Sequence, residues 1–328
     1  MAGRIEYLDI AKGLGIFCIV IGHNVVPQWF HDWIYSFHVP LFFIVSGYFY
    51  RQRSLAETIG KIWKQLLRPM LVTIFVAQVA LAILFLRHGI WQGPTLEQWI
   101  SDILLMRQIG TGMWFLLALG WGKLFLCLLH KMGDTILPIA VIVLFLLSFY
   151  LRNEVYMVPW SLLRGLSVPL YLYIGMLLNK YSVLDKISTL PFFLFALCII
   201  SIAWLFPFNM HAMIYPFGLL SVLMACVISL SVLVIVKKLS EWSDMPKRLF
   251  HFAGLNSLFI LCIHCLIHTW QLDRLFWNAL PPVGENVHFV LGLGVIALAE
   301  CLILVGLVHS LNRVPWIYVL FHGKIKMV

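Results

Sequence analysis

The chain has 328 residues, of which 62% are hydrophobic and only 11% are charged, against about 25% charged residues in an ordinary soluble domain. Apolar runs near bilayer-spanning length recur along the chain, which excludes a soluble globular protein and predicts one all-α, polytopic membrane domain over residues 1–328. The net charge is +9, but no segment resembles a module that reads a nucleic-acid groove, so we expect no nucleic-acid partner.

About ten apolar segments are candidate membrane helices. In chain order they cover roughly residues 10–28, 35–50, 69–87, 113–130, 135–151, 166–179, 190–206, 213–236, 251–271 and 289–311. The sixth segment is short and contains Pro169 and Gly175, so we expect a broken or tilted helix there. An even number of spans places both termini on the same side of the membrane.

The basic residues indicate which side that is. With the N-terminus inside, the outer segments hold five of the 23 lysines and arginines, namely Arg87, Arg107, Arg152, Arg164 and Arg274. The remaining 18 (23 minus 5) fall on the inner segments. This positive-inside bias predicts cytoplasmic termini and supports the ten-span topology.

The first apolar segment carries Asp9 and Lys12 near one end and His23 and Asn24 near the other. From Lys12 to His23 the helix makes about three turns plus 20°, so both are predicted to share a face, about 16 Å apart, with Asp9 one turn below. A histidine in an apolar segment usually faces a bundle interior or a cavity. His23 is therefore either a structural residue bonded to a carbonyl, or a base aligned with a cation that binds an anionic cofactor.

The second segment contains His38 near its outer end and the pair Ser46-Gly47 further along. Small residues such as this pair let another helix approach closely. His38 is expected at a depth similar to that of His23, so the two histidines could form an acid–base or relay pair. An interfacial histidine that faces water is an equally common arrangement.

The linker that follows is basic, and Lys61, Lys64 and Arg68 occur in it at helical spacing, on one predicted stripe. Such a stripe could bind lipid headgroups, which is the commoner reason, or the phosphates of a nucleotide cofactor. Arg68 lies beside Pro69 at the mouth of the third segment, which makes it the strongest cofactor candidate of the three.

Isolated polar residues occur in the later segments. Glu300 lies midway along the last segment, where an unpaired charge costs on the order of 3 kcal/mol, so we expect it to pair with an inward histidine or arginine, or with a substrate hydroxyl. Arg164, on the outer side, could hold a phosphate or carboxylate of an acceptor. Trp114 could stack on a sugar, although tryptophans are common at membrane interfaces.

The ninth segment carries the pair Asn256-Ser257 and the run Cys262, His264, Cys265 and His268. His264 and His268 share a helical face from which the cysteines point away, so we expect two inward histidines and no metal site. The Asn256-Ser257 pair, or Asn24, could donate hydrogen bonds to an oxyanion, or could cap and pack helices. All seven cysteines lie in apolar segments, which favours packing over disulfides.

Several blocks of this chain occur together in one known family. They are Lys12 and His23 separated by ten residues, Pro-Leu-Phe-Phe-Ile-Val-Ser-Gly at 40–47, Arg68-Pro69, Trp114-Phe115-Leu116, and Gly254-Leu255-Asn256-Ser257-Leu258 before His264. With these blocks the chain resembles the acyltransferase-3 family of integral membrane acyltransferases, and most of all its sugar O-acetylases (fucose 4-O-acetylase-like). One position departs from the family pattern. Leu261 stands where family members often have a tyrosine, so we expect His264 to orient other groups.

The resemblance implies transfer of an acetyl or small acyl group from cytoplasmic acetyl-CoA to a hydroxyl of a cell-surface or lipid-linked sugar, glycolipid or polysaccharide, at a bacterial-type cytoplasmic membrane. Lys12 and Arg68, with Lys64 in reserve, would bind the CoA phosphates. His23, with His38 nearby, would act as the general base or would carry the acyl group itself.

The acceptor would contact residues from several segments, namely Arg164, Trp114, Asn256, Ser257 and Glu300. The alternative function is a multi-span transporter of a small anionic or glycan-related solute. Two features argue against it, because the two halves of the sequence show no internal repeat and the cation and the histidine lie on a single helix.

Overall fold

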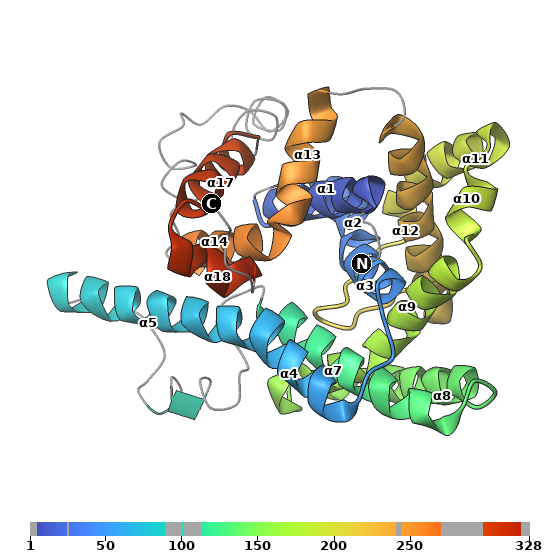
Figure 1. Ribbon diagram of the computed structural model, residues 1–328, viewed down its shortest axis with the longest axis horizontal. Helices are drawn as coiled ribbons and strands as arrows, with labels where there is room; N and C mark the ends of the chain where they lie inside the picture. Colours follow the sequence, from blue (N-terminus) through green and yellow to red (C-terminus); the bar gives the residue numbers. More distant parts are fainter. Residues whose placement is uncertain are drawn as a thin grey trace.

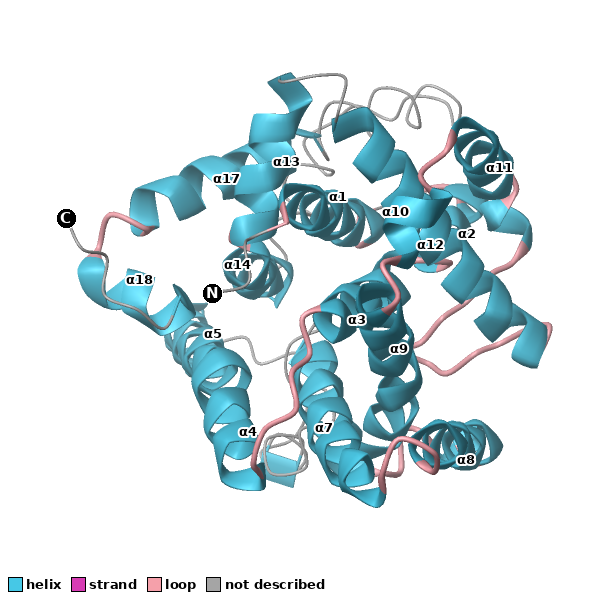
Figure 2. Ribbon diagram, turned by 45° about the vertical axis from the view of Figure 1, so that its right-hand side comes forward, coloured by secondary structure: helices cyan, strands magenta, loops and turns pink. Residues whose placement is uncertain are grey.

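The structure is a computed structural model that describes residues 5–24, 26–88, 97, 100–101, 113–240, 245–269 and 298–322. These residues form helices and loops without a β-strand, apart from one isolated bridge between Asn209 and Ile214 (Figures 1 and 2). Within them, three helices are long and apolar enough to cross a bilayer, or five if each of two bent pairs counts as one span. The all-α, multi-pass class is therefore confirmed, whereas the number ten stays a prediction.

The helices vary in length from a single turn to about six turns. In chain order they are α1 (Glu6–Gly22), α2 (Gln28–Tyr35), α3 (His38–Tyr48), α4 (Leu55–Ile62), the π-helix η1 (Trp63–Leu67), α5 (Arg68–His88), α7 (Met113–Leu129), α8 (Leu137–Tyr150), α9 (Leu162–Lys180), α10 (Val183–Ile187), α11 (Leu190–Ser201), α12 (Leu219–Ser240), α13 (Met245–Leu255), α14 (Ser257–Thr269), α17 (Leu298–Leu311) and α18 (Pro315–His322). Short 3₁₀ turns η2 (His130–Met132), η3 (Arg152–Glu154), η4 (Pro159–Ser161) and η5 (Ala203–Leu205) join some of them.

The first predicted segment ends earlier than expected. The last residue of α1 is Gly22, and His23 is its C-terminal cap, with its backbone N–H bonded to the carbonyl of Ile19 at 3.2 Å. The side chain of Asn24 donates to the carbonyl of Val20 at 3.0 Å and competes with further helical bonding. The chain then turns, so His23 lies at the end of a helix rather than inside one.

The sixth predicted segment is one continuous helix, so of the two expectations the broken helix is wrong and the tilted helix stays a prediction. The helix α9 runs from Leu162 to Lys180 with Pro169 inside it. Proline removes one backbone hydrogen bond, but α3, α7 and α8 all pack against α9. Neighbouring helices of this kind keep a proline-containing membrane helix in place.

The ninth predicted segment is not a single straight span. Its two helices, α13 and α14, meet at an angle of 76° on either side of Asn256. The carbonyl of Phe252 accepts from the side chain of Asn256 at 2.8 Å and from its backbone N–H at 3.2 Å, so Asn256 caps the end of α13 at the bend. The tenth segment is described from Leu298 onward, and α18, which was not predicted, follows it after a bend of 113°.

The helix α1 lies among α3, α12, α13 and α14 (Figure 2). It crosses α13 with backbones in contact, because both helices present a glycine at the crossing. A Cβ atom on Gly254 would overlap the carbonyl oxygen of Asp9, and one on Gly13 would overlap that of Phe250. Glycines at both positions are what allows this approach.

A second close crossing joins α3 to α9. A Cβ atom on Gly47 would overlap the carbonyl oxygen of Leu172, and one on Gly175 would overlap that of Ile44. The expectation that Ser46-Gly47 lets another helix approach closely is therefore confirmed. These two crossings fix α1 against α13 and α3 against α9, and both α1 and α3 line the cavities described next.

Candidate functional site

Lys12 is held in place near the first end of α1. Its Nζ lies 2.6 Å from Oδ1 of Asp9, one turn earlier. The Asp9 residue is 3% exposed, and Nε2 of His251 lies 3.8 Å from its other carboxylate oxygen. A buried carboxylate needs such partners, and in return it restricts the position of the lysine ammonium. The Lys12 side chain remains 25% exposed and faces a cavity.

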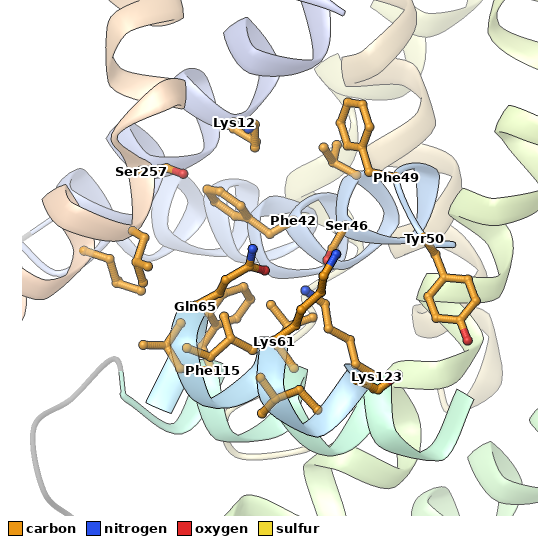
Figure 3. Close-up of a pocket in the computed structure, with 18 of the residues that line it drawn as sticks. Lys12, Phe42, Ser46, Phe49, Tyr50, Lys61, Gln65, Phe115, Lys123 and Ser257 are labelled. Atoms are coloured by element: carbon orange, nitrogen blue, oxygen red, sulfur yellow. The ribbon is translucent and has the colours of Figure 1, made fainter. Parts of the chain in front are cut away.

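This cavity has a volume of about 500 Å³, and we call it the basic cavity. Its cationic lining residues are Lys12, Arg51, Arg53, Lys61 and Lys123, and no acidic residue is found among its described lining. In Figure 3 the side chains of Lys61 and Lys123 extend toward Ser46 of α3. Cavities of this size hold small-molecule ligands, and converging cations select a ligand with several negative charges.

The cations of the basic cavity repel one another. Desolvation lowers the pKa of Lys61 below its ordinary value; Arg53 and Arg51 lower it further and Glu57 raises it. A bound anion would relieve this repulsion. Sequence reasoning missed Lys123, although a lysine within the apolar segment 113–130 was an available signal that this face of the helix is polar.

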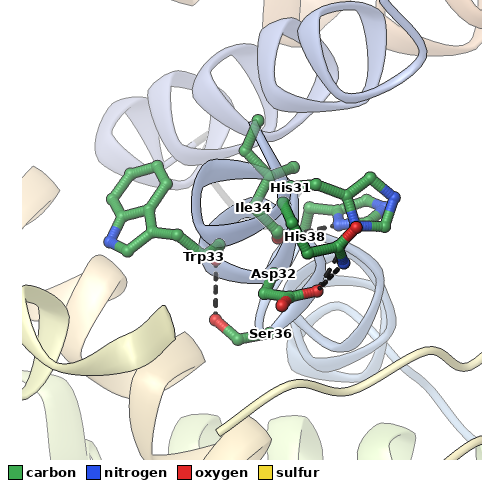
Figure 4. Close-up of polar contacts among 7 residues, drawn as sticks. His31, Asp32, Trp33, Ile34, Ser36 and His38 are labelled. Carbon is green, nitrogen blue, oxygen red and sulfur yellow. Dashed lines mark hydrogen bonds and ion pairs between the residues drawn. The ribbon is translucent and has the colours of Figure 1, made fainter. Parts of the chain in front are cut away.

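A second cavity of about 210 Å³ lies at the other end of α1, and we call it the histidine cavity. Its polar and aromatic lining residues are His23, His31, Tyr35, His38, Trp114, Asn209 and His211. The Nδ1 of buried His38 donates to the carbonyl of Ile34 at 2.8 Å, as Figure 4 shows. Because a carbonyl only accepts, a neutral His38 carries its proton on Nδ1 and keeps Nε2 as its basic nitrogen.

The helix α2 forms one wall of the histidine cavity. His31 stacks on Tyr35 with 3.8 Å between ring centroids, and Tyr35 meets His38 edge-on at 4.8 Å. These contacts fix three rings of the lining relative to one another. Sequence reasoning missed His31 and Tyr35 as site residues, because residues 29–34 were expected to connect two spans and Tyr35 to begin the second, whereas both lie in a separate helix, α2.

Behind His23 lies a partly buried polar cluster. The ring of His23 is 5.2 Å from that of His264, centroid to centroid. The Nδ1 of His264 donates to Oε1 of Glu300 at 3.1 Å, and Nδ2 of Asn24 donates to Oε2 of the same carboxylate at 2.9 Å. The expected pairing of Glu300 with an inward histidine is thus confirmed. Because a carboxylate only accepts, a neutral His264 carries its proton on Nδ1.

Another wall of the histidine cavity comes from the loop between η5 and α12. The Nε of Arg164 donates to the carbonyl of His211 at 2.6 Å, and its guanidinium lies 5.6 Å from the ring centroids of Trp114 and Tyr156. Burial, and then the Arg164 charge, lower the pKa of His211 to about 4, so this imidazole is neutral at pH 7. Arg164 itself is 5% exposed and holds the loop against α7.

The two cavities follow the same face of α1. Lys12, Ile16 and Ile19 line the basic cavity, and His23 lines the histidine cavity. Steps of four, three and four residues describe one stripe along a helix, so the predicted shared face of Lys12 and His23 is confirmed. The N-terminal half of α1 therefore faces the cations, and its C-terminal end faces the histidines.

The helices α3 and α7 repeat this arrangement. On α3, Ser46 lines the basic cavity and His38 the histidine cavity, and on α7 the corresponding residues are Lys123 and Trp114. On α14, Ser257 lines the basic cavity, and His264 lies beside the His23 ring. The helices α1, α3 and α7 thus contribute one end to each cavity, whereas α14 lines only the basic cavity and contacts His23.

The predicted stripe of linker cations is divided among three environments. Lys61 lines the basic cavity, and Lys64 is exposed and outside that lining. Arg68 donates from Nη2 to the carbonyls of Val319 and Leu320, at 2.9 and 3.1 Å, and is also outside the lining. The single stripe is therefore wrong, because the wider π-helical turn η1 separates Lys61 from Arg68.

Asn256 is the remaining predicted substrate contact, and the structure places it in a helix-capping network. Its Oδ1 accepts a hydrogen bond from Nδ2 of Asn312 at 2.7 Å, in addition to its own bond to Phe252. It lies outside the described lining of both cavities. Asn312 in turn meets Nε2 of His322 at 3.2 Å, so Asn256 connects the α13–α14 bend to α18.

Comparison with known proteins gives one match. Residues 5–306 match the Acyl_transf_3 family model, described as an acyltransferase domain. No curated protein and no solved structure matches the chain. The matched range contains all lining residues of both cavities.

Proposed function

The chain belongs to the acyltransferase-3 family, and from this premise we propose that it transfers an acetyl group from acetyl-CoA to a sugar hydroxyl. One observation carries the proposal: a single face of α1 presents Lys12 to the basic cavity and His23 to the histidine cavity. An anionic donor and a neutral hydroxylic acceptor then have separate sites that meet at His23.

The basic cavity suits the donor. CoA carries several phosphate charges, which Lys12, Lys61, Lys123 and Arg53 would neutralise. The apolar part of the same lining, including Phe49 and Leu66, suits the less polar arm that follows the phosphates. Ile16 and Ile19 continue this lining toward His23, so the arm would place its thioester at the histidine end of α1.

The histidine cavity suits a sugar. Trp114 and Tyr35 offer flat aromatic surfaces, and Asn209 offers an amide that can both donate and accept hydrogen bonds. A cavity with apolar walls and few polar groups selects a ligand that has both kinds of surface. Arg164, which was considered as a ligand for an acceptor anion, supports this site indirectly by holding the His211 loop.

His23 is placed to act as general base. It removes the proton of the acceptor hydroxyl while the hydroxyl oxygen attacks the thioester carbonyl carbon. A carbon–oxygen bond forms, the carbon–sulfur bond breaks, and His23 returns the proton to the sulfur, so that the products are the ester and free CoA. Glu300 stabilises the transient positive charge through His264.

The alternative is that His23 accepts the acyl group first and passes it to the hydroxyl in a second step. Rapid acid quenching after a single turnover with labelled acetyl-CoA distinguishes the two routes. Label on the protein that disappears in His23→Gln and is discharged by acceptor indicates the acyl-histidine route.

The proposal is tested with purified protein in lipid nanodiscs. Release of free CoA thiol from acetyl-CoA is measured with a panel of methyl glycosides as acceptors. We expect acceptor-dependent release that falls at least about a hundredfold in His23→Ala. His309→Ala is the matched control, because His309 is exposed on α17 and outside the described lining of both cavities.

Two results would refute the proposal. One is a folded His23→Ala protein that turns over at the wild-type rate. The other is a wild-type protein that binds no acetyl-CoA and releases no thiol with any glycoside.

The sidedness is proposed from the positive-inside bias, which puts the basic cavity at the cytoplasmic face. In sealed vesicles, labelled acetyl-CoA supplied on the cytoplasmic side alone should then acetylate a glycoside enclosed on the other side. Transfer that requires both substrates on one side would reject the through-membrane arrangement, while the enzyme class would stand.

A further inference from the structure

An apolar layer lines the basic cavity at the end nearest, along each helix, to His23, His38, Trp114 and His264. It contains one side chain from each of four helices: Ile19 of α1, Phe42 of α3, Phe115 of α7 and Leu261 of α14. All four line the basic cavity. Among the residues that line the basic cavity, Ile19 is nearest along its helix to His23 and Phe42 is nearest to His38. In the same way Phe115 is nearest to Trp114, and Leu261 is nearest to His264. The route from Lys12 to His23 therefore passes these four side chains.

The layer is tightly packed. Phe42 meets Phe115 edge-to-face, with 5.8 Å between ring centroids and an interplanar angle of 70°. Phe115 also stacks on Phe43 at 4.8 Å, which limits its freedom to move aside. Ile19, Phe115 and Leu261 are less than a tenth exposed (7%, 9% and 4%). None of the four side chains contains a polar atom.

Phe42 is the least buried member of the layer, and its position depends on a glycine. A Cβ atom on Gly15 of α1 would lie 2.9 Å from Cε2 of the Phe42 ring. The ring therefore occupies the space that Gly15 leaves open. A side chain at position 15 would push the ring away from α1 and toward the route between the cavities.

We propose that Phe42 and Phe115 are specificity-determining residues that limit the width of the transferred acyl group. The inference rests on the proposed function, in which the thioester end of the donor passes this layer to reach His23. An unbranched acyl group needs a passage between the rings that is only as wide as one methylene group. A branched acyl group is wider, so it must displace a phenyl ring from its packed position. Core packing resists such displacement.

The test compares butyryl-CoA with isobutyryl-CoA, which have the same atoms and differ in branching. Thiol release is measured in nanodiscs with the methyl glycoside that supports acetyl transfer. We expect the wild-type protein to prefer butyryl-CoA over isobutyryl-CoA by at least about tenfold in kcat/KM. Phe42→Ala should reduce this preference at least about fivefold, and Gly15→Ala should lower transfer from both donors more than transfer from acetyl-CoA.

The matched control is Phe49→Ala. Phe49 is the C-cap residue of α3 and lines the basic cavity, but it is 40% exposed and about two turns away from Phe42. Its removal should leave the butyryl-to-isobutyryl ratio unchanged. Phe42→Leu, which keeps an apolar side chain of intermediate size, provides a second variant if Phe42→Ala does not fold.

A Phe42→Ala or Phe42→Leu protein that transfers acetyl groups but keeps the wild-type donor ratio would overturn the inference. So would a wild-type protein that uses both isomers equally. Neither result touches the proposed function, because acetyl transfer is measured in the same assay. Failure of the wild-type protein to use any acyl-CoA would refute the proposed function and, with it, this inference.

Discussion

The rings of His23 and His264 lie 5.2 Å apart between centroids, at an interplanar angle of 41°, and Glu300 holds the far side of the pair through Nδ1 of His264. His23 caps α1, His264 lies in α14 and Glu300 lies in α17. The base of the proposed reaction is therefore supported by residues from both halves of the chain. Removing the Glu300 carboxylate should therefore impair proton transfer by His23 while the lining of both cavities stays the same.

Glu300→Gln should lower turnover by roughly tenfold or more, the usual cost of losing an outer partner of a functional histidine. The KM for acetyl-CoA should stay constant, because Glu300 is outside the described lining of both cavities. The control is Glu154→Gln, at an exposed position in η3. An unchanged rate in a folded Glu300→Gln protein would show that the cluster is only structural.

Lys61→Ala should raise the KM for acetyl-CoA by about twofold to fivefold, because one exposed phosphate contact contributes up to about 1 kcal/mol. The increase should shrink in added salt, and the KM for the glycoside should stay constant. Lys64→Ala tests the geometry, since Lys64 carries the same charge three residues later but is outside the cavity lining. Equal effects of the two substitutions would indicate general surface attraction rather than a site.

Arg68→Ala should detach the C-terminal helix. Two charge-assisted hydrogen bonds to the carbonyls of Val319 and Leu320 are lost, each contributing about 1.5 to 3 kcal/mol. We expect a lower melting temperature and faster proteolysis within α18, measured in nanodiscs by fluorescence and by mass spectrometry of fragments. A higher KM for acetyl-CoA with unchanged proteolysis would instead favour the phosphate-binding role that the sequence suggested for Arg68.

Gly254→Ala should destabilise the protein, because the new Cβ overlaps the carbonyl oxygen of Asp9 and pushes α13 away from α1. Overpacking of this kind costs about 1 to 3 kcal/mol, and here the rigid partner is backbone. Gly60→Ala is the matched control, since a Cβ at Gly60 in α4 would meet nothing within 4 Å. A lower melting temperature is expected for Gly254→Ala alone, and equal values would contradict the close crossing.

Much of the membrane class and of α1 could be predicted from local patterns. Long apolar runs identify bilayer-spanning helices, since each residue there must satisfy its backbone within the helix. The spacing from Lys12 to His23 is a property of one helix, so its periodicity was enough to place both on one face. A partner for Glu300 could also be predicted, because an unpaired charge in an apolar segment is energetically costly.

Only the tertiary structure decided which groups meet. Nothing in the local pattern shows that Glu300 takes His264 as its partner, that Arg68 bonds to α18, or that Lys123 and Lys61 share a cavity. These pairings depend on the angles at which helices cross and bend, such as the close approach at Gly254 and the turn at Asn256. Such angles follow from packing between segments that are distant in the chain, and the periodicity of each segment does not encode them.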